Sequence, residues 1–311
     1  MVKYGCCFPG QGSQKQAMAI DLFENSKTVQ ELFELASDAA GLNIFNLLAY
    51  SNEQTLQQTE NAQLAITVAN RSAAILLEEG GIKFSCTSGS SLGELSAYAA
   101  SKVISEYELF KIVQKRGQLM ATATTRNGEL GMAAVIGIGF EKVEGILKAC
   151  GAENLYLSND NGPTQVVIAG NAKEIEKYSQ ILKAEGARKV VALKVSGPFH
   201  TPFMGDSQQQ FALFLEQFKF NEPQIPLYLN VTGKLAKDAK EVKSCCIEQI
   251  TKAVRWTTIM ESMVKDKNVD VALEVGPGTV ISGLWRNSGQ NIACHSLGTY
   301  KEIQDFLIGR D

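Results

Sequence analysis

The chain has 311 residues, of which 45% are hydrophobic and 20% are charged, and its formal net charge is −3. This length can bury a full core, and the composition is ordinary for a globular protein. The small net charge gives no indication of nucleic-acid or membrane-surface binding, and no apolar run reaches the roughly 18 residues that a membrane span requires. The N-terminus reaches a Phe8-Pro9-Gly10 turn too soon for a signal peptide, so we expect a cytoplasmic protein.

The cysteines point to neither a disulfide framework nor a metal site. There are seven, including the neighbours Cys6-Cys7 and Cys245-Cys246, and no C-x-x-C spacing occurs. The number is odd, and the chain has only two histidines to complete a zinc site. We therefore expect reduced, buried thiols and no metal.

The first part of the chain alternates predicted strands and helices. We expect strands at 2–8 and 82–87 and helices at 28–39, 62–79 and 94–100. The loop from Pro9 to Gln14 follows the first strand and lacks the glycine spacing of a phosphate-binding or dinucleotide-binding loop. It is either an ordinary connection or a close backbone approach to a ligand at the carboxyl edge of the sheet.

A G-x-S-x-G sequence, Gly89-Ser90-Ser91-Leu92-Gly93, stands between the second strand and the helix that follows. Strand, tight turn and helix is the context of a nucleophile elbow, in which the serine hydroxyl is pushed clear of the backbone. Of the serines in this stretch, only Ser91 has glycine two residues before and two residues after it. We therefore predict Ser91 as a nucleophile, with the helix N-terminus directing N–H groups at developing negative charge.

A buried arginine is predicted in the next helix, which opens with a capping box from Ser105 to Glu108. Arg116 lies on the apolar stripe of this helix, three or four residues from Ile112, Val113 and Met120. A guanidinium aimed at the interior needs a carboxylate partner. Periodicity alone favours an internal salt bridge, and the alternative is an acidic ligand.

After Arg126-Asn127-Gly128 the pattern changes to short strands and two helices. The predicted order is strand, helix, strand, strand, helix, strand, at 131–137, 140–150, 154–159, 164–170, 171–186 and 188–195, with the two middle strands joined at 160–163. This order is that of a ferredoxin-like unit, and we predict a subdomain at 128–196 inserted into the main domain. The main domain then resumes, with helices at 207–218, at 247–252 and from 280, and strands at 226–231 and 269–275.

Ser91 requires a general base, and the chain offers His200 and His295. His200 follows a Gly-Pro turn where the chain re-enters the main domain, and His295 lies near a C-terminal strand that could be peripheral. Position favours His200. No Asp or Glu is singled out as a third member of a triad, so that position stays open.

With these motifs collected, the chain resembles the malonyl-CoA:acyl-carrier-protein transacylase family nearly from end to end. The resemblance rests on Phe8 to Gln14, the elbow, Gln63, Arg116, His200, the segment from Asn161 to Gly170, Asn230-Val231-Thr232-Gly233 and Glu274 to Gly278. It implies an α/β fold, with an α/β-hydrolase-like main domain at 1–127 and 197–311 and a ferredoxin-like subdomain at 128–196. It also implies malonyl-CoA and an acyl carrier protein as partners, for fatty-acid or polyketide synthesis, and no cofactor.

The resemblance assigns a role to each matching position. Ser91 would carry the acyl group and His200 would be the base, while the N–H groups of Gln11 and Leu92 would form the oxyanion hole. Arg116 would bind the malonyl carboxylate, and the main-chain carbonyl of Gln249 would orient the histidine in place of a carboxylate. The remaining pocket and selectivity positions would be Gln63, Ser90, Met120 and Phe199.

The chain departs from the family pattern at several positions that leave Ser91, His200 and Arg116 unchanged. The departures are Ser90 for the usual histidine, Leu64 for a common proline, Lys252-Ala253 for Asn-Pro and Thr279 for a lysine. Phe199 resembles malonyl-selective members, since methylmalonyl-selective ones typically have serine there. Its ring would crowd an α-methyl branch, or it is plain core packing.

Two other functions fit the same elbow. A hydrolase would form the same acyl-serine and use water in place of the carrier thiol, although a buried Arg116 has no use with neutral acyl chains. A carrier-binding subunit without catalysis would not need the complete set of Ser91, His200 and Arg116. Arg188 and Lys189 are weak candidates for docking an acidic carrier protein, because adjacent charges are usually just a solvated surface.

Overall fold

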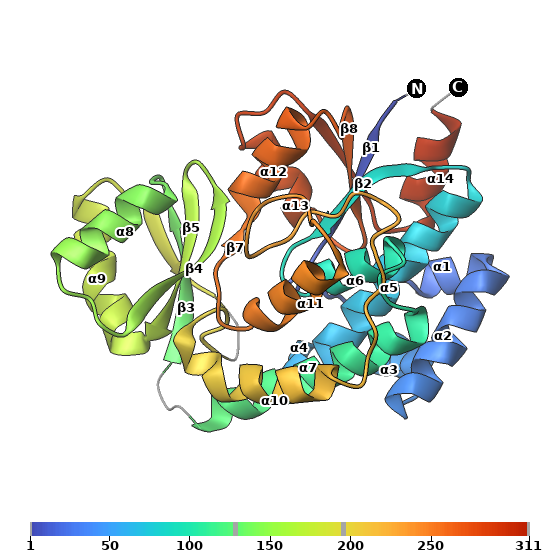
Figure 1. Cartoon of the computed structure of the whole chain (residues 1–311), viewed down its shortest axis with the longest axis horizontal. Helices are drawn as coiled ribbons and strands as arrows, with labels where there is room; N and C mark the ends of the chain where they lie inside the picture. The colour runs from blue at the N-terminus through green and yellow to red at the C-terminus, as the bar shows by residue number, and fades with distance from the viewer. Residues whose placement is uncertain (1, 127–129, 194–196, 310–311) are drawn as a thin grey trace.

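The computed structural model describes residues 2–126, 130–193 and 197–309 and builds the chain around two separate sheets (Figure 1). The first sheet is parallel, in the order β2-β1-β8-β9. Its strands are β1 (Tyr4–Phe8), β2 (Phe84–Gly89), β8 (Val271–Val275) and β9 (Ala293–Leu297). Because its strands are parallel, β1 and β2 end at one edge of the sheet, where open α/β sheets bind ligands.

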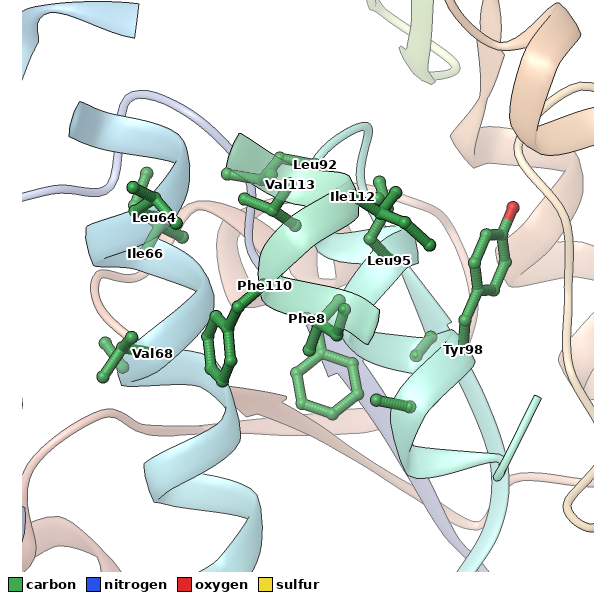
Figure 2. Close-up of a cluster of buried hydrophobic side chains, with 14 of the residues drawn as sticks. Phe8, Leu64, Ile66, Val68, Leu92, Leu95, Tyr98, Phe110, Ile112 and Val113 are labelled. Atoms are coloured by element: carbon green, nitrogen blue, oxygen red, sulfur yellow. The ribbon is translucent and has the colours of Figure 1, made fainter. Parts of the chain in front are cut away.

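The helices of the N-terminal part pack against this sheet and against one another. They are α1 (Ile20–Asn25), α2 (Lys27–Ala40), α3 (Ile44–Tyr50), α4 (Glu53–Gln57), α5 (Thr59–Glu79), α6 (Gly93–Ala100) and α7 (Glu106–Arg126). Figure 2 shows part of this core, where Phe8 of β1 and side chains of α5, α6 and α7, among them Val68, Leu95 and Phe110, gather. Close packing of this kind fixes the start of α6, and with it the elbow, relative to α7.

The predicted capping box at the start of α7 is confirmed. Glu108 N donates to Ser105 Oγ at 3.3 Å, and the Glu108 carboxylate accepts from Ser105 N at 2.8 Å. These two bonds satisfy backbone donors at the helix end. The predicted stripe is also confirmed, since Ile112 and Val113 are fully buried and Arg116 is buried on the same face.

The second sheet lies beside the first and has the order β6-β3-β5-β4-β7. Its strands are β3 (Leu130–Ile136), β4 (Leu155–Gly162), β5 (Gln165–Asn171), β6 (Lys189–Ala192) and β7 (Val254–Arg255). Helices α8 (Phe140–Ala149) and α9 (Ala172–Ala184) pack with β3, β4 and β5 around a core of their own. The predicted order of strands and helices is confirmed from β3 to β6. The predicted joint at 160–163 is too long, because β4 continues to Gly162 through two irregularities in its pairing with β5.

The last strand of the second sheet comes from outside the predicted insertion. β7 pairs in parallel with β4, with Asn159 opposite Val254 and Asp160 opposite Arg255. Thr257 Oγ1 donates to Asp160 Oδ1 at 2.5 Å, and the Arg255 guanidinium lies 4.2 Å from the centre of the Phe140 ring. A strand of two residues has no measurable periodicity, so no residue pattern predicts it.

The strand predicted at 226–231 is wrong. In its place are isolated bridges, Thr87 with Leu227 and Tyr228 with Leu235. Gly233 N donates to the carbonyl of Leu229 at 2.8 Å, and Gly233 has a φ of 69°. This turn reverses the chain directly after Tyr228, so the pairing does not extend beyond these two bridges.

The helix predicted at 247–252 is also misplaced. The structure has α11 (Ala239–Glu248), which begins where Asp238 accepts a hydrogen bond from Glu241 N at 2.7 Å. Gln249 therefore follows the end of this helix. The other helical elements are η1 (Pro202–Met204), α10 (Gly205–Leu215), α12 (Trp256–Lys265), α13 (Val280–Arg286) and α14 (Tyr300–Ile308).

All seven cysteines are free, which confirms the prediction of reduced thiols. Burial is confirmed for most of them, but Cys150 is exposed and Cys294 is half-buried. Across residues 2–126, 130–193 and 197–309, none of the helices combines the length and the apolar character needed to cross a membrane.

Candidate active site

The elbow has the geometry that its sequence predicts. β2 ends at Gly89, α6 begins at Gly93, and Ser91 between them has a φ of 53°, in the left-handed region that non-glycine residues seldom adopt. A Cβ on Gly89 would lie 2.0 Å from the carbonyl carbon of Gly93, and a Cβ on Gly93 would lie 2.1 Å from the carbonyl oxygen of Phe8. The two glycines therefore let strand, turn and helix pass within contact distance.

Asn230 holds the strained turn in place. Its Oδ1 accepts from Ser91 N at 2.7 Å, and its Nδ2 donates to the carbonyl of Gly89 at 2.7 Å. Asn230 is fully buried, as is its bond to Gly89, while its bond to Ser91 N is partly buried. The turn that replaces the predicted strand at 226–231 thus delivers this side chain to the elbow.

Ser91 and His200, the predicted nucleophile and base, lie within hydrogen-bond distance of each other. Ser91 Oγ lies 2.7 Å from His200 Nε2, and His200 Nδ1 lies 2.6 Å from the carbonyl oxygen of Gln249. A carbonyl oxygen can only accept, so Nδ1 carries the proton and Nε2 is free to accept from the serine hydroxyl. The third position, which the residues alone left open, is thus occupied by a main-chain carbonyl.

His200 is a neutral imidazole at physiological pH. Burial, together with the positive charge of Arg116, lowers the pKa of His200 from 6.5 to about 4. His200 as a whole is only 4% exposed. A neutral ring is the form that accepts a proton, so His200 is in the state that a general base requires.

Arg116 is buried beside the nucleophile and has no carboxylate partner among the described residues. Its Nη1 donates to Gln63 Oε1 at 2.9 Å, and its Nη2 donates to Gln249 Oε1 at 2.8 Å and to Ser91 Oγ at 3.3 Å. The internal salt bridge that periodicity favoured is therefore wrong. Burial lowers the pKa of Arg116 to about 10, so the side chain remains a cation at neutral pH.

A cavity of about 260 Å³ opens at Ser91 between the two sheets. Its walls include Gln11, Ser90, Met120 and Phe199 of the predicted site, with Asn159, Asn161, Gln165, Met132 and Val167 from the second sheet and Val280, Ile281 and Leu284 from α13. Gln63 is fully buried behind Arg116, and its Nε2 lies 3.4 Å from Met120 Sδ. The cavity thus combines the Ser91 hydroxyl, a cation and a mainly apolar wall.

Comparison with known proteins identifies the family. A model of the acyl transferase domain matches residues 6–306 of the chain. The chain belongs to this family. The malonyl CoA-acyl carrier protein transacylase of Staphylococcus aureus (strain COL) is 34% identical, over 98% of this chain and 98% of its own length.

Solved structures of the family agree with this assignment. The malonyl CoA-acyl carrier protein transacylase from Clostridium perfringens matches with a TM-score of 0.94 at 29% identity, covering 99% of this chain and 97% of that one. The malonyl-transacylase solved in complex with its type II PKS acyl-carrier protein matches with a TM-score of 0.93 at 31% identity, covering 99% of each chain. The predicted resemblance to the malonyl-CoA:acyl-carrier-protein transacylase family is confirmed.

Of the two histidines, this acyl transferase brings only His200 to the nucleophile. His295 lies on β9 at the edge of the first sheet, where its ring packs 5.3 Å from that of Phe306. Asn230 and Glu94 were not predicted as site residues. Asn230 stood in a segment that supported the resemblance, and the signal for Glu94 was a single charge at the start of an otherwise uncharged helix, 93–100.

Proposed function

We propose that this chain transfers a malonyl group from malonyl-CoA to the phosphopantetheine thiol of an acyl carrier protein, through an ester on Ser91. The observation that carries the proposal is the buried Arg116 cation, which contacts Ser91 Oγ and, among the described residues, has only neutral oxygens as partners. A buried cation without a counter-ion is unfavourable. A substrate carboxylate one methylene away from the reacting carbonyl would supply that counter-ion next to the nucleophile.

In the first half-reaction, His200 Nε2 takes the Ser91 proton as Oγ attacks the thioester carbonyl of malonyl-CoA. The new Oγ–C bond forms, the C–S bond breaks, and the proton on His200 passes to the CoA thiolate. In the second half-reaction, His200 takes the proton of the carrier thiol, whose sulfur attacks the ester. Ser91 Oγ then leaves and recovers the proton. The exchange of thioester for ester is redox-neutral and balances without a cofactor.

The oxyanion would be held by the N–H groups of Gln11 and Leu92. Gln11 lines the cavity in the loop after β1, and Leu92 directly follows the nucleophile before α6 begins. Within the described part of the chain, neither N–H donates to a protein acceptor, which leaves both available. Donors of this kind contribute roughly 2.7–4 kcal/mol each to transition-state stabilisation.

The arrangement of domains is part of the proposal. The parallel sheet with the elbow supports an α/β-hydrolase-like main domain at 1–127 and 197–311, and the strand order β6-β3-β5-β4 supports a ferredoxin-like subdomain at 128–196. The cavity lies between them, with Phe199 on its wall. This position supports a role for Phe199 in excluding an α-methyl branch and so in selecting malonyl.

The experiment that tests this function is intact-protein mass after brief exposure to malonyl-, methylmalonyl- or acetyl-CoA, with Ser91→Ala as the control. We expect a malonyl adduct that Ser91→Ala lacks and that an acyl carrier protein discharges. An adduct discharged by water alone would indicate a hydrolase. No adduct from any donor would indicate a binding subunit without catalysis.

A further inference from the structure

Glu94 has a buried carboxylate that contacts two residues next to Ser91, namely Asn230 and Gln249. It lies in the first turn of α6, three residues after the nucleophile, and is fully buried. Its Oε1 accepts from Asn230 N at 2.5 Å, and its Oε2 accepts from Gln249 Nε2. In the part of the chain that the structure describes, it forms no ion pair. A buried carboxylate satisfied only by neutral donors calls for an explanation.

We propose that Glu94 is a positioning residue that fixes the direction of the Gln249 amide and thereby holds Arg116 beside Ser91. The proposal rests on the proposed function, because Arg116 is the group that would bind the malonyl carboxylate. It adds to that function a residue that does not touch the substrate but determines how well the substrate is recognised.

The argument is one of hydrogen-bond direction. An ionised carboxylate can only accept, so Gln249 must turn its NH2 group toward Glu94. The same NH2 group donates to the carbonyl of Ser91 at 3.0 Å. The Gln249 amide oxygen then necessarily faces the other way, where it accepts from Arg116 Nη2 at 2.8 Å. A reversed amide would set its NH2 group against that N–H donor and release one side of the guanidinium.

The neutral amide also separates the two charges. Were Glu94 in direct contact with Arg116, the guanidinium would already have a counter-ion and would bind a substrate carboxylate less well. Gln249 and Gln63 instead offer Arg116 uncharged oxygens. Arg116 is thus held in place while its charge stays available to a ligand.

The surroundings of Glu94 make this direction sensitive to pH. Burial raises the pKa of Glu94 to about 7, although hydrogen bonds from Asn230 and Gln249 and the charge of Arg116 oppose the shift. The other titratable groups around it are Tyr98, on its own helix, and Cys245 and Cys246 of α11; burial raises the pKa of each. Below pH 7 the carboxyl group of Glu94 is protonated and carries an O–H donor. This donor would face another donor, either Asn230 N or the Gln249 NH2 group.

The test is Glu94→Gln, which keeps the size of the side chain but adds an NH2 group that must face either Asn230 N or Gln249 Nε2. The measurement is the rate of acyl-enzyme formation from malonyl-CoA and from acetyl-CoA, followed by intact mass. We expect the ratio of malonyl to acetyl rates to fall about tenfold or more, as for the loss of one hydrogen bond to a charged group. Removing a nearby negative charge would by itself raise the malonyl preference, so a purely Coulombic effect has the opposite sign.

Two companion variants separate positioning from general damage. Glu106→Gln removes the carboxylate that pairs with the buried Arg71 at 2.7 Å, and we expect it to leave the malonyl-to-acetyl ratio unchanged. In an Arg116→Ala background, Glu94→Gln should not change the ratio further, because the group through which it acts is gone. An unchanged ratio in a folded Glu94→Gln protein, or an equal fall in the Arg116→Ala background, would overturn the proposal.

Wild-type protein supplies a second measurement should Glu94→Gln fail to fold. Between pH 8.5 and pH 6 the malonyl carboxylate stays ionised, since carboxyl groups titrate near pH 4. We expect the malonyl-to-acetyl ratio to fall as the pH drops through 7, and a flat ratio would contradict the proposal. A malonyl adduct on Ser91 at pH 8.5 would support the proposed function whichever of these results is found.

Discussion

Arg116 Nη2 donates to Ser91 Oγ at 3.3 Å, so a buried guanidinium and the nucleophile share a hydrogen bond. In a malonyl thioester, one methylene separates the carboxylate from the carbonyl under attack. A cation adjacent to the nucleophile can therefore bind the carboxylate while the carbonyl lies over Oγ. With Arg116 in the proposed role, the same contact would make the site selective for one acyl group as well as reactive toward it.

Arg116→Ala should reduce the specificity for malonyl-CoA by about 10²–10⁴, or roughly 3–5 kcal/mol, while sparing acetyl-CoA. The comparison is kcat/KM for the two donors. Arg71→Ala removes a second buried arginine, one that pairs with Glu106 away from the cavity, and should lower stability without changing the ratio. If Arg116→Ala used the two donors in the wild-type ratio, the carboxylate role would be wrong.

The reactivity of Ser91 should stay constant from about pH 8 to pH 5 and decline only toward pH 4. His200 is active as the neutral ring, and burial keeps its pKa near 4, so protonation begins well below the usual value of 6.5. A serine-directed phosphonate is the appropriate reagent, because it carries no carboxylate for Arg116 to bind. Circular dichroism at each pH controls for unfolding, and an inflection near pH 6.5 would show that the ring is not shielded.

Gly93→Ala should prevent the elbow from forming. The added Cβ would lie 2.1 Å from the carbonyl oxygen of Phe8, and the backbone would have to move to accept it. We expect a loss of about 1–3 kcal/mol or more in the free energy of unfolding, measured by urea denaturation. Gly145→Ala is the matched control, because that glycine lies within α8 with open space around it. There alanine should stabilise the helix by up to about 1 kcal/mol.

Asn230→Ala should slow acylation by every donor to the same extent. It would leave Ser91 N and the Gly89 carbonyl without their buried partner, at a cost of about 1–3 kcal/mol for each group. Thermal unfolding and acyl-enzyme formation report the two consequences. Asn287→Ala, which removes an exposed hydrogen bond to Gly283, should affect neither. A selective loss with malonyl-CoA would mean that Asn230 acts on the carboxylate and not on the turn.

Phe199→Ser should widen the cavity and admit an α-methyl branch. We expect the ratio of methylmalonyl to malonyl acylation to rise by a factor that corresponds to about 1–3 kcal/mol. Phe218→Ser removes another buried ring, remote from the cavity lining, and controls for loss of stability. A ratio that stays constant in both variants would assign Phe199 to core packing.

Local patterns predicted the elements of the site better than their mutual contacts. Three features are predicted by patterns only a few residues long, and the structure has each of them. They are the glycines around Ser91, the capping box of α7 and the apolar stripe that carries Arg116. No local pattern predicted which side chains bind Arg116. Gln63 and Gln249 lie 53 and 133 residues away from it in the chain, and no spacing rule links such positions.

The errors in the secondary structure have the same origin. The segment 226–231 has the composition of a strand, but a turn closed by Gly233 leaves it with isolated bridges. The start of α11 depended on the cap from Asp238, which a short apolar pattern at 247–252 did not reveal. In both places hydrogen bonds of a turn or a cap, and not the propensity of the residues around them, set the limits of the element.

The pairing of β7 with β4 has a consequence for how the chain folds during synthesis. β3 to β6 can assemble as soon as they leave the ribosome, but the outer edge of β4 stays unpaired until Val254 and Arg255 have been made. Such an edge can pair with another nascent chain. A fragment that ends before β7, such as residues 130–193 alone, would keep the same open edge, so a version of this subdomain made by itself would need a strand equivalent to β7 beside β4.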